Sequence, residues 1–238
     1  MALQEIIPLA PARGVYNVPM VSIAIQAGGR SIRMGRDKAL MPLAGRRLVE
    51  YVLAQVQGLS DDLFITTNHP ALLKDLHVRL VPDEEPGRGA LFGLKTALKA
   101  ARNDHVLIVA CDMPFLERAL VEYLLSLAGQ ADVIIPLIEG EYEPLLAVYQ
   151  ASTCLPAIER SSVRANQRMI SFFSEVHILP VEAEIIQRLD PQRWSFFNIN
   201  APGDFAAAER ILAEKAIRTD HKTQPRPTRN PTPSIGEQ

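Results

Sequence analysis

The sequence predicts an α/β protein in which helices cover both faces of a mostly parallel sheet, a Rossmann-like three-layer sandwich. Short apolar, β-branched runs alternate with stretches of helical spacing along most of the chain. Two of the runs, Val21–Gln26 and His105–Ala110, are apolar enough to be buried strands. The 238 residues suffice for one large domain with a substantial core.

Each predicted element follows from its apolar spacing and its flanking turn residues. Strands are expected at residues 21–26, 63–67, 78–81, 105–110, 132–136 and 144–149. Helices are expected at 48–56, 89–101 and 116–128, with a short one at 71–76. This βαβ alternation throughout the chain places ligand-binding loops at the carboxyl ends of the strands.

The domain boundaries follow from composition. We expect residues 1–19 to be an N-terminal extension, without the basic start and apolar core of a secretory signal. Residues 20–218 form the expected main domain. Residues 219–238 combine prolines, threonines and charges with almost no apolar side chains, which predicts a disordered tail.

Overall composition excludes several classes of partner. The chain is 47% apolar and 22% charged, its net charge is -2 and its pI is about 6.2. These values give no general electrostatic attraction for nucleic acid or for an anionic membrane surface. No apolar run approaches the roughly 20 residues of a membrane span, and a cytoplasmic location is expected. Cys111 and Cys154 lack zinc or redox spacing and are expected to be reduced and buried.

The segment from Ala27 to Lys38 follows the first strand and is rich in glycine and basic residues. Glycine lets backbone N–H groups approach a ligand, and Arg33 and Lys38 supply positive charge, a combination that suits a triphosphate. The alternative is a solvated turn without a ligand. A Walker A loop is excluded because Ala39 follows Lys38, so the Mg²⁺-binding hydroxyl is missing.

Two further features lie after strands. Asp112 ends the strand 105–110, where a carboxylate can hold Mg²⁺ together with substrate phosphates; the alternative is a cap for the helix near Leu116. Gly87, Gly89 and Gly93 nearly match a dinucleotide-binding fingerprint, but their spacing favours a loop and helix start.

Four segments, taken in order, resemble the molybdenum cofactor guanylyltransferase family over about Val21 to Leu212. They are Ala27-Gly28-Gly29-x-Ser31-x-Arg33-Met34-Gly35-x-Asp37-Lys38-Ala39, Gly89-Ala90-Leu91-Phe92-Gly93, Cys111-Asp112-Met113-Pro114-Phe115, and Phe197-Asn198-Ile199-Asn200 with Pro202 and Asp204. The resemblance implies the nucleotide-diphospho-sugar transferase type of the fold and a Mg²⁺-dependent enzyme.

The resemblance also implies roles for individual residues. The nucleotide-binding residues that it implies are Gln26, Ala27, Gly28, Lys38, Asn68, Asp83 and Asp112. It implies catalytic roles for Arg33, Lys38 and Asp112, with Asp112 on the metal.

On the acceptor side, the resemblance implies Asn198 and Asn200, which alternate along an expected short strand. Asn200 is a further candidate metal ligand, or else a cap for the helix near Pro202. The family-like segment Glu143–Tyr149 is also implied there, without an assigned chemistry.

The implied reaction transfers GMP from GTP to the phosphate of a molybdopterin-type cofactor and releases pyrophosphate. Other proteins of molybdenum cofactor biosynthesis are the implied partners. The alternatives are a cytidylyltransferase using CTP, a sugar-phosphate nucleotidyltransferase, and a nucleotide-binding protein without turnover. Ala27-Gly28-Gly29 resembles the guanine users, because the cytidine users carry Ala-Ala-Gly, whereas Gln26 replaces the usual leucine and leaves base preference open.

Overall fold

The computed structural model describes residues 20–28, 37–162 and 168–223. The expected N-terminal extension, Arg33, and residues 224–238 of the expected tail lie outside the described residues. Within them, no helix combines the length and apolar character that a membrane crossing requires.

The helices and strands alternate in the first half of the described chain and become less regular after it. The strands are β1 (Val21–Ala27), β2 (Pro42–Leu43), β3 (Arg46–Arg47), β4 (Leu63–Thr67), β5 (Arg79–Pro82), β6 (His105–Ala110), β7 (Val133–Ile138), β8 (Glu141–Tyr142), β9 (Leu146–Gln150) and β10 (Ile178–Val181). The α-helices are α1 (Leu48–Val56), α2 (Ala90–Ala100), α3 (Arg118–Ser126), α4 (Ala151–Ser162), α5 (Ala183–Leu189) and α6 (Pro202–Thr223). The 3₁₀ helices are η1 (Lys38–Leu40), η2 (Pro70–Leu76), η3 (Phe173–Glu175) and η4 (Trp194–Phe196).

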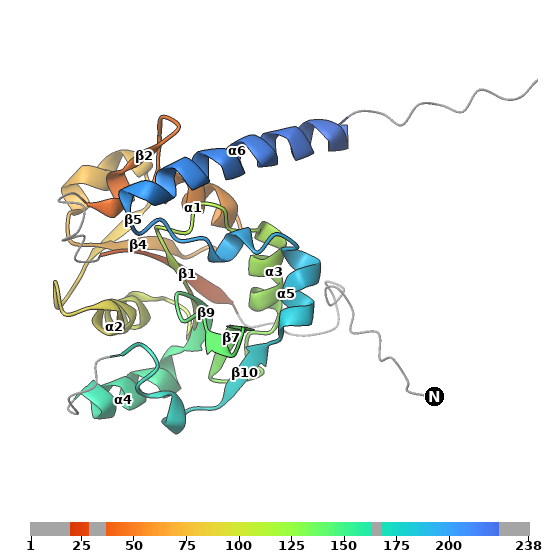
Figure 1. Cartoon of the computed structure of the whole chain (residues 1–238). Helices are drawn as coiled ribbons and strands as arrows, with labels where there is room; N and C mark the ends of the chain where they lie inside the picture. Colours follow the sequence, from red (N-terminus) through yellow and green to blue (C-terminus); the bar gives the residue numbers. More distant parts are fainter. Residues whose placement is uncertain (1–19, 29–36, 163–167, 224–238) are drawn as a thin grey trace, which may run out of the picture.

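The main sheet has the order β10-β7-β9-β6-β1-β4-β5, with β8 paired to β7. β1 is parallel to both β4 and β6, β4 to β5, and β7 to β10. Helices α2 and α4 cover one face, while α1, α3 and α5 cover the other (Figure 1). The predicted three-layer fold with a mostly parallel sheet is confirmed.

The expected βαβ alternation is wrong at β9. This strand runs antiparallel to both of its neighbours, β6 and β7, and the chain reaches it through the β7–β8 hairpin. The hairpin turn consists of Glu139 and Gly140, which have φ of 52° and 83°, so both occupy the left-handed region that a two-residue hairpin favours. Glu-Gly is a weaker turn signal than Asn-Gly, which explains why periodicity alone missed the reversal.

The strand and helix predictions hold best where burial is complete. The segments 48–56, 63–67 and 105–110 match α1, β4 and β6, because every residue of β6 and the core face of α1 are buried. Two other expectations are wrong. Residues 197–200 form no strand, and α6 continues to Thr223, so the first residues of the expected tail are helical.

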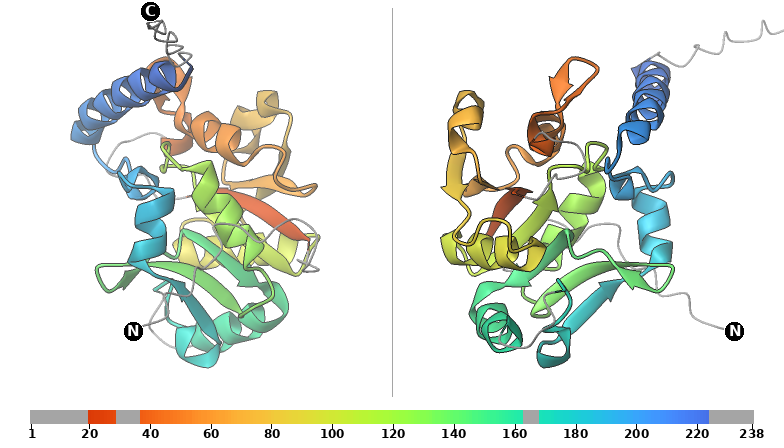
Figure 2. Two further views of the ribbon diagram at one scale, coloured as in Figure 1. Left: turned by 90° about the vertical axis from the view of Figure 1, so that its right-hand side faces the viewer. Right: turned by 60° about the vertical axis from the view of Figure 1, so that its left-hand side comes forward.

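A third apolar cluster packs α6 against β2 and α1. Ala208 of α6 packs with Leu43 of β2, Leu48 of α1, Phe115 and Ile199. The two views of Figure 2 show α6 beside the β2–β3 hairpin at one end of the molecule. This cluster holds the segment that carries Asn198 and Asn200 close to β2, which follows η1 and Lys38 in the chain.

Asp62 directly precedes β4 and lies at the amino ends of the parallel strands. It organises a buried polar cluster, and only 2% of its surface is exposed. Its carboxylate accepts hydrogen bonds from Ser22 Oγ at 2.7 Å, Arg102 N at 2.8 Å and Arg79 Nη2 at 2.6 Å. Burial raises the pKa of Asp62, but these hydrogen bonds and the charge of Arg79 outweigh it, so the pKa is lowered.

Asp62→Ala is expected to lower the free energy of unfolding by about 3 kcal/mol at pH 7, because it leaves buried donors without an acceptor. The folded-state pKa lies below the unfolded one, so the stabilisation is complete above about pH 4 and is lost as the pH falls through the folded pKa. Urea unfolding of both proteins across this pH range checks it. Asp61→Ala, at the exposed neighbouring carboxylate, is the control and should cost less than about 0.5 kcal/mol.

Candidate active site

The predicted site residues meet at the carboxyl edge of β1, β4, β5 and β6. The N–H of Cys111, just after β6, donates to the carbonyl of Gln26 at 3.0 Å, and the N–H of Asp83, just after β5, donates to the carbonyl of Thr67 at 3.2 Å. These bonds align the carboxyl ends of the strands. They bring Gln26–Gly28, Asn68, Asp83 and Asp112 to the same edge of the sheet.

Lys38 lies at the centre of this edge. Its Nζ contacts Asp112 Oδ2 at 2.7 Å and donates to Asn200 Oδ1 at 2.9 Å. The side chains of Lys38 and Asp112 are 19% and 17% exposed, so the ion pair is partly shielded from water but still accessible. Residues 74 and 162 positions apart from Lys38 are thereby joined in one polar group.

The backbone around Asn200 explains why its side chain faces Lys38. The N–H of Ile199 donates to the carbonyl of Asp112 at 3.0 Å, which fastens this segment to the end of β6. Asp204 Oδ2 accepts from the N–H groups of Asn200 and Ala201 at 2.7 and 2.8 Å, and these hydrogen bonds lower the pKa of Asp204. Asp204 therefore fixes the backbone just before α6, and the Oδ1 of Asn200, which could otherwise cap that helix, accepts from Lys38 instead.

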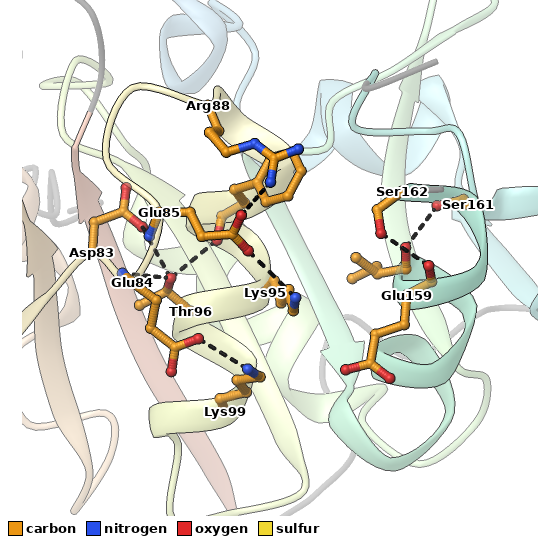
Figure 3. A network of polar contacts seen from close by, with 12 residues as sticks. Asp83, Glu84, Glu85, Arg88, Lys95, Thr96, Lys99, Glu159, Ser161 and Ser162 are labelled. Carbon is orange, nitrogen blue, oxygen red and sulfur yellow. Dashed lines mark hydrogen bonds and ion pairs between the residues drawn. The ribbon is translucent and has the colours of Figure 1, made fainter. Parts of the chain in front are cut away.

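Gly28 lies next to the two residues expected around the nucleotide. A Cβ at this position would lie 3.5 Å from Asp83 Oδ2 and 3.7 Å from Asn68 Nδ2. Asp83 is held in place through its other oxygen, Oδ1, which accepts from Thr96 Oγ1 at 3.0 Å and from the N–H of Glu85 at 3.3 Å (Figure 3). Oδ2 of Asp83 is thereby turned toward Gly28.

Two buried polar atoms at this edge have no hydrogen-bond partner among the described residues. They are Nε2 of Gln26, a donor, and Oδ1 of Asn68, an acceptor. The Gln26 amide lies against α2, where a Cβ on Gly93 would be only 3.3 Å from Oε1. Unpaired buried polar atoms cost free energy, so they are a feature expected at a ligand site.

The loop before α2 is tied to that helix by charges. Lys95 and Lys99 of α2 pair with Glu85 and Glu84 at 3.4 and 2.9 Å, along the side of the helix drawn in Figure 3. The loop ends at Gly89, whose φ of 102° favours glycine at the position before the first helical turn. The predicted loop and helix start is confirmed.

The structure brings together most of the predicted site. Asp112 does not cap α3, because that helix begins at Arg118 with Glu117 at the N-cap position. Asn198 is half-buried, and its side chain makes no hydrogen bond to the rest of the described chain. The antiparallel β9 adds Glu143, whose chemistry the sequence left unassigned, and Thr96, which orients Asp83, was not identified from sequence.

Both cysteines are free and buried, as predicted. Burial, reinforced by the charge of Asp112, raises the pKa of Cys111 far above its ordinary value. Burial raises the pKa of Cys154 to about 12. A thiol that stays protonated is a poor nucleophile, so the thiol beside Asp112 is not equipped for covalent catalysis.

The donor set around Asp112 fits a hard divalent cation. Oδ2 of Asp112 is engaged by Lys38, whereas no side chain of the described ranges bonds Oδ1. The amide oxygen of Asn200 is close to the same lysine. Among the described residues no group of three or more His, Cys, Asp or Glu side chains could hold a metal ion.

Gly28, Lys38 and Asp112 thus lie at the carboxyl edge of a three-layer α/β sheet, the edge at which open sheets of this kind bind their ligands. A profile of the family described as MobA-like NTP transferase domain matches residues 23–178. The chain belongs to this family.

Individual relatives match this chain over nearly their whole length. A probable molybdenum cofactor guanylyltransferase of Chloroflexus aggregans is 34% identical over 204 residues, covering 83% of this chain and 98% of that protein. One from Natranaerobius thermophilus is 33% identical, covering 82% and 97%. The crystal structure of molybdopterin-guanine dinucleotide biosynthesis protein A from Archaeoglobus fulgidus has a TM-score of 0.71 at 26% identity, covering 82% of this chain and all of that one.

Both thiols are expected to resist a water-soluble thiol reagent such as Ellman's reagent in the native protein at pH 7. They should react fully in denaturant, because exposure restores their ordinary pKa. Absorbance of the released thiolate gives the count. Cys154→Ser isolates Cys111, and rapid labelling of that variant under native conditions would contradict the burial of Cys111.

Proposed function

We propose that the protein transfers GMP from GTP to the terminal phosphate of a molybdopterin-type cofactor and releases pyrophosphate. The observation that carries the choice of nucleotide is the pair of acceptors beside Gly28. Asn68 contributes a buried, unpartnered amide oxygen, and Asp83 contributes a carboxylate oxygen.

Guanine complements this edge because it has two adjacent N–H donors, N1–H and the 2-amino group, together with the O6 acceptor. Asn68 and Asp83 would accept from the donors, and the unpartnered Nε2 of Gln26 would donate to O6. Adenine and cytosine each present a single donor group at this edge, so they leave one protein acceptor unpaired. The backbone of Gln26–Gly28 would approach the nucleotide closely, since Gly28 has no side chain.

The triphosphate would lie between the glycine loop and Asp112. Lys38 would donate from Nζ to phosphate oxygens, and Arg33 would add a second positive charge. Asp112 would hold Mg²⁺, with Asn200 as a further oxygen donor, and the ion would neutralise charge that develops on the phosphates. Lys38 pairs with Asp112 in the structure, so binding of phosphate and Mg²⁺ would exchange one charge partner for another.

The acceptor phosphate is already an anion and can attack the α-phosphorus in line without a covalent enzyme intermediate. The protein then supplies alignment and charge neutralisation, through Arg33, Lys38 and Asp112. Asn198 and Asn200 would lie on the acceptor side. We place the reaction in the cytoplasm and expect proteins of molybdenum cofactor biosynthesis to deliver and receive the cofactor.

Calorimetric titration with Mg²⁺ and each of GTP, CTP, ATP and UTP tests the nucleotide. GTP is expected to bind at least tenfold more tightly than the others, because the mismatched bases leave Asn68 or Asp83 unpaired. Lys38→Met should weaken GTP binding by about 10- to 100-fold, the effect of losing a charge-assisted hydrogen bond. Asp112→Asn should abolish the dependence of binding on Mg²⁺.

Lys74→Met is the control, because it removes an exposed lysine of η2 away from the strand ends. Pyrophosphate release in the presence of acceptor then separates an enzyme from a binding protein. A preference for CTP would assign the cytidylyltransferase alternative, and saturable GTP binding without turnover would leave only a nucleotide-binding protein.

Gly28→Ala separates the nucleotide role of this glycine from a folding role. The added methyl group would meet Asp83 and Asn68 at ordinary contact distances, so the melting temperature should change by less than about 2 °C. GTP binding should weaken about tenfold, because the methyl group fills space beside the base-contacting atoms, while CTP binding improves relative to it. Equal loss of both nucleotides, or a large drop in melting temperature, would contradict this role.

A further inference from the structure

Glu143 is brought to the site by the antiparallel direction of β9. Because β9 runs opposite to β6, the residues that precede β9 lie beside the carboxyl end of β6. The N–H of Ala110, the last residue of β6, donates to the carbonyl of Leu145 at 3.0 Å. The turn 143–145 therefore neighbours Asp112, two residues further along the chain.

Hydrogen bonds hold this turn in one conformation. The N–H of Glu143 donates to the carbonyl of Pro136 at 3.1 Å, and the hydroxyl of Tyr149 donates to the carbonyl of Pro144 at 2.7 Å. Within the turn, Oε1 of Glu143 accepts from the N–H of Leu145 at 3.2 Å. One carboxylate oxygen is thus oriented by the backbone, and the second oxygen has no partner in the part of the chain that the structure describes.

Glu143 has no basic side chain as an ion-pair partner among the described residues. Asp112 is paired with Lys38, whereas no described lysine, arginine or histidine forms an ion pair with Glu143. Burial, followed by the charge of Asp112, raises the pKa of Glu143. A half-buried carboxylate without a counter-charge favours partners that donate hydrogen bonds, and the second oxygen of Glu143 is available to accept them from a bound molecule.

Its position in the sheet separates Glu143 from the nucleotide. The proposed nucleotide contacts follow β1, β4 and β5, which lie on one side of β6, whereas β9 lies on the other side. Asp112 at the end of β6 stands between the two groups. The substrate beside Glu143 is consequently the second one, the acceptor.

We propose that Glu143 is a binding residue for the acceptor, whose carboxylate accepts hydrogen bonds from ring N–H groups of the pterin. This inference rests on the proposed function for the identity of the acceptor. A carboxylate repels the acceptor phosphate, so it selects the other end of the molecule. The 2-amino-4-oxo ring of a pterin presents adjacent N–H donors, which match the oxygens of a carboxylate.

Glu143→Gln tests the charge while preserving the turn, since the glutamine amide oxygen can still accept from the N–H of Leu145. Fluorescence titration with 6-hydroxymethylpterin monophosphate should give a dissociation constant about tenfold higher for the variant, the difference between a charged and a neutral acceptor. The dissociation constant for GTP with Mg²⁺ should stay within twofold. Glu141→Gln, at an exposed carboxylate of β8, is the matched control and should change neither.

The N3-methyl analogue of the same probe gives a second readout that a structural role would not affect. The wild type should bind it about tenfold more weakly than the parent probe, and Glu143→Gln should bind both alike. Equal binding of the two probes by the wild type would overturn the inference. Unchanged probe affinity in Glu143→Gln would overturn it too. A variant that loses affinity for Mn²⁺ in a separate titration, while its affinity for the probe stays the same, would assign Glu143 to the metal and also overturn the inference.

The two proposals fail in different ways. Wild-type protein that binds the pterin probe but no GTP would sink the proposed nucleotide while supporting the acceptor role of Glu143. Wild-type protein that binds GTP but not the pterin probe would overturn the acceptor role and leave nucleotide binding intact.

Discussion

The pairing of β1 with strands on both sides is the constraint on which the rest of the site depends. Parallel pairing to β4 and β6 requires all three strands to end at the same edge. The residues at these strand ends, Gln26–Gly28, Asn68 and Asp112, therefore lie at the same edge of the sheet although they are distant in sequence. The complete burial of β1 and β6 makes any other register costly, because a shift would expose apolar side chains.

The polar groups at this edge divide into those that are satisfied and those that are not. Asp62, at the amino ends of the parallel strands, is buried and fully hydrogen-bonded, and it serves the fold. Gln26, Asn68 and Glu143 instead have side-chain atoms without hydrogen-bond partners among the described residues, and all three lie at the carboxyl edge of the parallel strands. The polar cluster that stabilises the fold and the candidate site therefore lie at opposite ends of the parallel strands.

The third apolar cluster has a role beyond packing. By fixing Ile199 between Phe115 and α6, it holds Asn200 within hydrogen-bonding distance of Lys38. Helix α6 thus completes the site from outside the sheet, and the same cluster reaches α1 and β2. A helix that covers neither face of the sheet thus determines one side of the candidate site.

Sequence by itself determined the alternating elements, the buried strands β1, β4 and β6, and the roles expected for Lys38 and Asp112. These follow from local periodicity and from a motif whose residues are close in the chain. Tertiary structure decided what depends on long-range pairing. The reversal at β9, which brings Glu143 to the edge, rests on a two-residue turn, and the contact of Lys38 with Asn200 rests on packing between residues far apart in sequence. Hydrophobic periodicity reports which face of an element is buried, but not which strand lies next to it or in which direction it runs.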